Sequence, residues 1–177
     1  LVKHTKPESL LPVDTVLSIV SRVSLALDYA HRQQVVHRDI KPANIMFEPD
    51  TNAVKVTDFG IARISDSYKT KTGLVLGTPS FMSPEQLAGA SADGRSDLYS
   101  LGVTLYQLLT GVLPFRGDSM AELMYKITHE DAVDVRLHRP ELTEELARLV
   151  QRAVMKATEV RFQTGAEFAL CLEKYVT

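Results

Sequence analysis

The sequence contains no tryptophan, a single cysteine and no glycine before Gly60. With Cys171 alone, an intramolecular disulfide is excluded and a reducing compartment is the simplest inference. No run of about 18 apolar residues occurs, so we expect no membrane span in this segment. The formal net charge of −2 provides no bulk attraction to nucleic acid or to an anionic membrane surface. We therefore expect a cytoplasmic segment, whether or not a longer parent protein is anchored elsewhere.

The first residues lack an initiator methionine and an apolar signal core, so we expect the chain to be an excised piece. Its 177 residues suit one domain, which buries roughly 70% of the surface of its unfolded chain. A hydrophobic content of 45% and a charged content of 24% are ordinary for a globular protein. Size and composition therefore predict one domain with a real core.

Apolar residues recur at helical spacing from Pro12 to about Ala30, which predicts an amphipathic helix. Residues 45–47 and 53–56 are short apolar runs separated by turn-forming residues, which predicts a small β-hairpin. From Ser96 to Gly111 the sequence is apolar on nearly every helical face, as is typical of a helix buried in a core.

Ser119 and Thr164 are each followed three residues later by a glutamate, which predicts capping boxes that open two more helices. Thr143 precedes another helix, which we expect to run to about Met155. Residues 61–84 lack a steady period, and a loop of that length inside a compact domain is usually functional or disordered. The elements together predict a mostly helical protein.

Two short motifs carry chemistry. His37-Arg38-Asp39-Ile40-Lys41-Pro42-Ala43-Asn44 precedes Asp58-Phe59-Gly60, with only the expected hairpin between them. The first motif offers a carboxylate to a hydroxyl, a lysine to a transferring phosphate and an amide oxygen to a metal. The second offers a carboxylate to the same metal. This combination is the equipment of protein-kinase phosphoryl transfer.

With these motifs in this order, the chain resembles the C-terminal lobe of a eukaryotic-type protein serine/threonine kinase, most closely the bacterial members. The resemblance covers essentially the whole chain. It implies a mainly α fold, the helical C-lobe of a kinase with one or two small β-hairpins at the catalytic cleft. Residues 1–177 would form one partial domain without the N-lobe, with a catalytic loop at 37–44 and an activation segment at 58–85.

The resemblance also implies roles for the motif residues, with ATP and Mg²⁺ as cofactors. Asp39 would orient the attacking hydroxyl, and Lys41 would offset charge that develops on the γ-phosphate. Asn44 and Asp58 would hold Mg²⁺, which prefers oxygen ligands. Together with these side chains, Met46 would contact the nucleotide.

Other residues take regulatory or structural roles by the same resemblance. Arg38 marks kinases whose activation loop is switched by phosphorylation, because the arginine pairs with the new phosphate. Thr70 and Thr72 stand where bacterial members carry phosphosites. Thr78 resembles the threonine that bonds the catalytic aspartate and lysine on the substrate side. Lys41 and Thr78 both favour the serine/threonine branch over tyrosine kinases.

A further set is expected to be structural. His37 and Phe59 would stack in an apolar column that aligns the lobes. Asp97, at the start of a segment resembling the central helix of the family, would accept backbone N–H bonds from the catalytic loop. Glu85 would pair with Arg161. Ser83-Pro84-Glu85 stands where the family has Ala-Pro-Glu, and Tyr99 replaces the more common tryptophan.

The main departure is the missing lobe: no glycine-rich loop or strand lysine occurs in these residues. We therefore expect the isolated fragment to be inactive, although its parent would act on protein substrates. The face toward the missing lobe, around Met46, Phe59 and the segment before Pro12, should be exposed and partly apolar. An exposed apolar face often drives association, so self-association through it is a further expectation.

Two other interpretations are open at this point. The parent could be a pseudokinase or scaffold lobe that acts by protein binding, which the missing lobe favours and the intact motifs oppose. Phosphoryl transfer to a small molecule on a kinase-like fold is weaker, because Arg38 and the segment from Thr78 to Glu85 resemble parts built for protein substrates.

Overall fold

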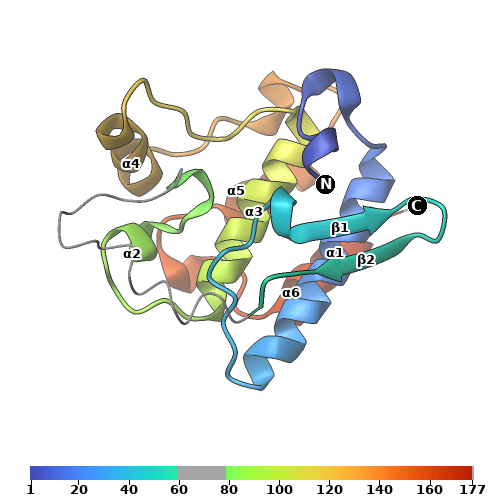
Figure 1. Cartoon of the computed structure of the whole chain (residues 1–177). Helices are drawn as coiled ribbons and strands as arrows, with labels where there is room; N and C mark the ends of the chain where they lie inside the picture. The colour runs from blue at the N-terminus through green and yellow to red at the C-terminus, as the bar shows by residue number, and fades with distance from the viewer. Residues whose placement is uncertain (60–78, 177) are drawn as a thin grey trace.

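The computed structural model describes residues 1–59 and 79–176. Three helices form the framework: α1 (Val13–Arg32), α3 (Gly94–Thr110) and α6 (Gly165–Glu173). Helix α1 packs against α6 on one side and α3 on another, and α3 also packs against α5 (Glu144–Ala153). Figure 1 shows α3 running through the middle of the molecule. The framework is helical, as the sequence predicts.

Helix α3 is the centre of the core. Its residues are buried without a break from Ser96 to Tyr106, which confirms the prediction from its uniformly apolar faces. The helix ends at Gly111, whose φ of 77° is the left-handed conformation that a glycine adopts without strain. A Cβ at this glycine would lie 2.4 Å from the Pro7 backbone nitrogen. Any other residue at this position would therefore clash with the N-terminal segment.

The only sheet in the described residues is an antiparallel hairpin of β1 (Ile45–Glu48) and β2 (Ala53–Val56). Ile45 pairs with Val56 and Glu48 with Ala53, in agreement with the predicted hairpin. Figure 1 shows the hairpin lying across α1, with the N-terminus beside β1. The Leu1 amino group donates to the Ile45 carbonyl oxygen at 2.7 Å. The hairpin and the first residues therefore lie at the same edge of the fold.

The smaller elements correct several predicted boundaries. Helix α1 begins at Val13 after an N-cap at Pro12 and extends to Arg32, and α5 ends at Ala153 rather than Met155. In residues 1–11, for which no element was predicted, 3₁₀ turns span Val2–His4 and Pro7–Ser9. Helix α4 (Met120–His129) follows Ser119 as predicted. Helix α2 (Pro84–Leu87) was not predicted.

The predicted capping boxes are only half formed. Ser119 and Thr164 accept the expected N–H bonds from Glu122 and Glu167. The two glutamates, however, accept from the backbone N–H groups of the preceding residues, Asp118 and Gln163, instead of the caps. The complete capping box opens α2 instead. Among the residues that the structure covers, no helix has both the length and the hydropathy needed to cross a bilayer.

Candidate active site

Asp97, near the start of α3, binds the backbone of the segment that follows α1. The Asp97 carboxylate accepts the backbone N–H groups of His37 at 2.8 Å and of Arg38 at 2.7 Å. Its Oδ2 also lies 2.7 Å from His31 Nε2, which donates to it. Asp97 is almost fully buried, so these three donors replace the water that a carboxylate would otherwise need. The predicted backbone contacts are therefore present.

His31 has a contact that the sequence did not predict. A histidine near the C-terminal end of a helix often serves only as a charge there. The His31 ring instead reaches α3 and becomes the third partner of Asp97. Gly94 makes room for the ring, because a Cβ there would lie 2.6 Å from His31 Nδ1.

His37 connects this loop to the end of the hairpin. Its buried ring donates from Nε2 to the Thr57 carbonyl oxygen at 2.7 Å, and Nδ1 accepts the Asp39 backbone N–H at 3.2 Å. These partners assign the proton to Nε2. The ring also meets Phe59 edge to face, with centroids 4.6 Å apart. His37 and Phe59 are therefore in contact, but edge to face rather than stacked, and their role in aligning the lobes stays a prediction.

Asp39, Lys41 and Asn44 form one cluster. Asp39 Oδ2 lies 3.1 Å from Lys41 Nζ and accepts from Asn44 Nδ2 at 3.1 Å. Asn44 Nδ2 also donates to the Asp39 carbonyl oxygen at 2.7 Å. The side chains of Asp39 and Lys41 are 44% and 37% exposed, whereas Asn44 is buried. The Asn44 side chain is thus largely enclosed and braces Asp39 through Nδ2, whereas the two charged groups face solvent.

Asp58 is brought beside this cluster by Thr57. The Thr57 backbone N–H donates to the Asn44 carbonyl oxygen at 2.9 Å. Its hydroxyl lies 3.3 Å from both that oxygen and Asp58 Oδ2. The strand end that carries Asp58 is therefore fastened to the turn that carries Asn44. The two motifs meet at one edge of the hairpin.

Two site residues have an unusual backbone. Arg38 has a φ of 67° and Asp58 a φ of 63°, a conformation that costs a residue other than glycine of order 1–3 kcal/mol. At Arg38 the hydrogen bond from its backbone N–H to Asp97 offsets part of that cost. Such strain gathers at functional sites, where the surrounding contacts over-determine the backbone.

The donor set fits Mg²⁺. Asn44 uses Nδ2 for its bonds to Asp39, which leaves Oδ1 available to a cation. Asp58 supplies a second oxygen ligand from the adjoining segment, and Mg²⁺ in kinases takes its remaining ligands from phosphate and water. Within residues 1–59 and 79–176 there is no cluster of three or more histidine, cysteine or acidic side chains that would form a closed metal cage.

A buried ion pair anchors α2. Arg161 is 0% exposed and binds both Glu85 oxygens at 2.8 Å. Burial alone would raise the pKa of Glu85, but hydrogen bonds from Arg161 and Ser96 outweigh it and hold that pKa below its usual value. The guanidinium also donates to the carbonyl oxygens of Met155 and Lys156. The expected Glu85–Arg161 pair is present.

Two further groups of residues were predicted: an exposed apolar face around Met46 and Phe59, and the threonines of the activation segment. Met46 is 59% exposed and Phe59 is 40% exposed, so the face predicted to be open and partly apolar does carry exposed apolar side chains. Thr70, Thr72, Thr78 and most of the activation segment lie outside the described residues.

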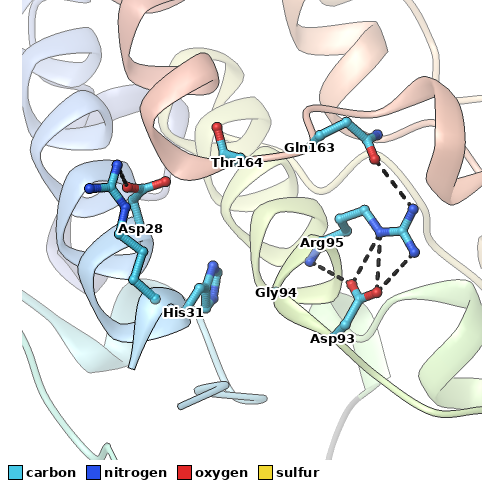
Figure 2. A pocket seen from close by; sticks show the side chains of 8 residues that line it. Asp28, His31, Asp93, Gly94, Arg95, Gln163 and Thr164 are labelled. Atoms are coloured by element: carbon cyan, nitrogen blue, oxygen red, sulfur yellow. Dashed lines mark hydrogen bonds and ion pairs between the residues drawn. The ribbon is translucent and has the colours of Figure 1, made fainter. Parts of the chain in front are cut away.

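A cavity of about 400 Å³ lies at the C-terminal end of α1, and Asp39, Lys41 and Asn44 are not among its lining residues (Figure 2). The N-terminal ends of α3 and α6 complete its lining. Its charged side chains are already paired, Asp28 with Arg32 at 2.7 Å and Asp93 with Arg95 at 2.9 Å. His31 is the lining residue that contacts Asp97.

Comparison with known proteins agrees with this geometry. The protein kinase domain family matches residues 1–170. The chain belongs to the protein kinase family. It is 46% identical over 154 residues to serine/threonine-protein kinase PknB of Mycobacterium tuberculosis, a match covering 85% of this chain and 24% of that protein. It is 48% identical over 151 residues to serine/threonine-protein kinase pkn3 of Myxococcus xanthus, covering 80% of this chain and 28% of the relative.

The fold matches a kinase domain as well. The crystal structure of the Mycobacterium tuberculosis PknI kinase domain superposes with a TM-score of 0.69 and 31% identity, over 93% of this chain and 56% of that one. The chain thus spans about a quarter of the length of these two curated relatives and just over half of this kinase domain. Its similarity is to bacterial serine/threonine kinases of the eukaryotic type.

Proposed function

We propose that residues 1–177 form the C-lobe of a protein serine/threonine kinase, which transfers the γ-phosphate of ATP to serine or threonine hydroxyls of protein substrates. The observation that carries this proposal is the cluster of Asp39, Lys41 and Asn44, joined to Asp58 through Thr57. In-line phosphoryl transfer needs positioned groups and charge neutralisation more than covalent chemistry. The four side chains supply both.

Each side chain has a task that its contacts allow. Asp39 Oδ2 is held by Lys41 and Asn44, so Oδ1 is left to accept a hydrogen bond from the substrate hydroxyl. Lys41 is close enough to Asp39 to place its ammonium group beside the transferring phosphate. Asn44 and Asp58 would hold the metal, with Met46 at the nucleotide. Bound Mg²⁺ supplies charge neutralisation on the phosphate oxygens.

The other half of the nucleotide site would come from an N-lobe outside residues 1–177. Leu1 lies beside β1, so a lobe joined there would stand over the exposed side chains of Met46 and Phe59. We call the two lobes together the complete kinase domain. On this proposal residues 1–177 alone transfer little or no phosphate, because half of the site is missing.

Regulation would use residues at the edge of the site. Thr70 and Thr72 are the proposed phosphosites, with Arg38 as the partner of the new phosphate. Thr78 is the proposed substrate-side contact to Asp39 and Lys41. We also propose that residues 1–177, without their N-lobe, self-associate through the face around Met46 and Phe59.

The test of function measures transfer of labelled γ-phosphate from Mg²⁺-ATP to a basic protein substrate. The complete kinase domain should transfer phosphate to the substrate, and residues 1–177 alone should not. Turnover by residues 1–177 at the rate of the complete domain would contradict the lobe assignment. A complete domain that binds partners but transfers nothing would instead identify a pseudokinase or scaffold.

The test of self-association compares the molar mass of residues 1–177 by light scattering with that of a Met46→Ser variant. The control is Leu170→Ser, which changes an equally exposed side chain on α6. We expect the unsubstituted chain to have a molar mass above that of a monomer, and we expect Met46→Ser, but not Leu170→Ser, to lower it. A monomer at high concentration would overturn the proposal.

A further inference from the structure

A glutamine on α2 reaches the segment that carries the proposed catalytic aspartate. Gln86 Nε2 donates to the Arg38 carbonyl oxygen at 3.2 Å. The other end of the same amide, Oε1, accepts from the backbone N–H of Ser83 at 3.0 Å and from its hydroxyl at 3.1 Å. One planar amide therefore spans the start of α2 and the catalytic loop.

The start of α2 is a firm support for this contact. Ser83 is fully buried and forms a complete capping box with Gln86. Glu85, directly before Gln86 in the helix, is tied to Arg161 and accepts from the Ser96 hydroxyl at 2.6 Å. Because the backbone of α2 is anchored at Ser83 and at Glu85, directly before the glutamine, the Gln86 side chain has little freedom to follow the loop. The loop is held by the side chain instead.

The carbonyl that Gln86 holds belongs to the peptide bond between Arg38 and Asp39. The other end of Arg38, its backbone N–H, is bound by Asp97. The residue lies in the left-handed conformation, with a φ of 67°, so the loop needs contacts that keep it there. Asp97 fixes the peptide before Arg38, and Gln86 fixes the peptide after it. The second peptide sets the direction in which the Asp39 side chain leaves the backbone.

We propose that Gln86 is a positioning residue for Asp39, acting through the Arg38–Asp39 peptide. The inference rests on the proposed function, in which Asp39 orients the attacking hydroxyl. It assigns α2 a second task besides the Glu85–Arg161 anchor: it holds the peptide bond that precedes Asp39 in the catalytic loop. A displacement of about 1 Å in a reacting group is enough to slow catalysis on the order of a hundredfold.

The chemistry of glutamine allows the link to be tested without disturbing the cap. Gln86→Glu preserves the shape and the acceptor for Ser83, but a carboxylate cannot donate to the Arg38 carbonyl. Gln86→Met is a neutral replacement of similar length that lacks both the donor to Arg38 and the acceptor for Ser83. Ser83→Ala is the matched control, because it removes the cap hydroxyl and leaves Nε2 free to reach Arg38. An alanine there also resembles the Ala-Pro-Glu of the family.

The experiment measures kcat and the KM for ATP of the complete kinase domain and of these three variants, together with their thermal unfolding. We expect kcat to fall on the order of ten- to a hundredfold in both Gln86 variants, with the KM for ATP changed less than about twofold. Ser83→Ala should retain kcat within about twofold, even if its unfolding temperature falls. Wild-type kcat in Gln86→Met, or equal losses in all three variants, would overturn the proposal.

A second measurement separates this inference from the proposed function. The Asp39 backbone N–H donates to His37 Nδ1. The rate at which this amide exchanges its hydrogen with solvent reports on the loop without any catalysis. If the wild-type domain transfers no phosphate, the proposed function fails, yet faster exchange in Gln86→Glu than in Ser83→Ala still supports the positioning of Asp39 by Gln86. Unchanged exchange in Gln86→Glu overturns it.

Discussion

Arg161 and Glu85 form a two-armed ion pair, in which Nη1 and Nη2 each lie 2.8 Å from one carboxylate oxygen. The arginine is fully buried and its guanidinium lies over the Tyr99 ring. The pair joins α2 to the segment before α6, two regions far apart in the sequence. Because a buried charge depends on its partner, this contact is a sensitive point for the stability of the fold.

The first prediction concerns the loss of that partner. Glu85→Gln leaves the Arg161 charge buried without a counter-ion and should lower the free energy of unfolding by about 3–5 kcal/mol. Urea unfolding measures the change. The control is Glu144→Gln, which breaks the exposed pair with Arg148 on α5 and should change the free energy by less than about 1 kcal/mol. Equal effects of the two substitutions would show that burial of the pair is not important.

The second prediction is a pH dependence from the same carboxylate. The pKa of Glu85 is lowered in the folded protein: burial acts against this, and the hydrogen bonds from Arg161 and Ser96 outweigh it. Its contribution is therefore fully present above the unfolded pKa of about 4.3 and is lost as the pH falls through the lower folded pKa. Below about pH 4, wild type should lose more stability per pH unit than Glu85→Gln. Parallel curves of unfolding free energy against pH would contradict this assignment.

The third prediction concerns Tyr106 on α3. Its buried hydroxyl has no hydrogen-bond partner among the described residues, and burial, aided by the charge of Asp134, raises its pKa to about 12. Tyr106→Phe removes an unsatisfied polar group, so stability should be unchanged or higher by about 1–3 kcal/mol. Thr104→Val is the control, since that hydroxyl donates to Ser100 and its loss should destabilise by about 1 kcal/mol. A clear destabilisation by Tyr106→Phe in urea unfolding would reveal a partner for the hydroxyl.

Local sequence patterns predict contacts between residues close along the chain, whereas the long-range contacts of Glu85 and Asp97 were expected only from the resemblance to the kinase family. The proposed catalytic cluster of Asp39, Lys41 and Asn44 lies within six consecutive residues, and their register is fixed by the local turn and by the hairpin that follows. Local patterns are sufficient there. The hairpin and the buried α3 were predicted for the same reason, because two-residue and helical periods are local properties.

The contacts that the sequence did not predict join distant segments. His31 on α1 binds Asp97 on α3, and Gln86 on α2, a helix that was not predicted, donates to the Arg38 carbonyl oxygen. No period in the sequence indicates such pairs. One local signal was available, because Ser83 and Gln86 have the spacing of a capping box. The other two boxes are half formed because Glu122 and Glu167 accept from the backbone N–H one residue before the cap. Residue spacing alone does not distinguish these two acceptor geometries.

The fourth prediction concerns the metal. Asp58→Asn removes the charged oxygen ligand, so the free Mg²⁺ concentration for half-maximal transfer by the complete kinase domain should rise on the order of tenfold or more. Chelation of Mg²⁺ should abolish transfer. Asp50→Asn, in the exposed turn of the hairpin, is the control and should leave the Mg²⁺ dependence unchanged. An unchanged dependence in Asp58→Asn would exclude this carboxylate as a ligand.

The most direct test of the account is the rate of phosphoryl transfer by the complete kinase domain with Asp39→Asn, measured beside its affinity for Mg²⁺-ATP. Asparagine retains the shape of the side chain but not the carboxylate that would orient and deprotonate the hydroxyl. We predict a fall in kcat of about 10²- to 10⁴-fold with nucleotide affinity within about twofold of wild type. Transfer at the wild-type rate by Asp39→Asn would contradict the central claim, that this cluster is where the phosphate is transferred.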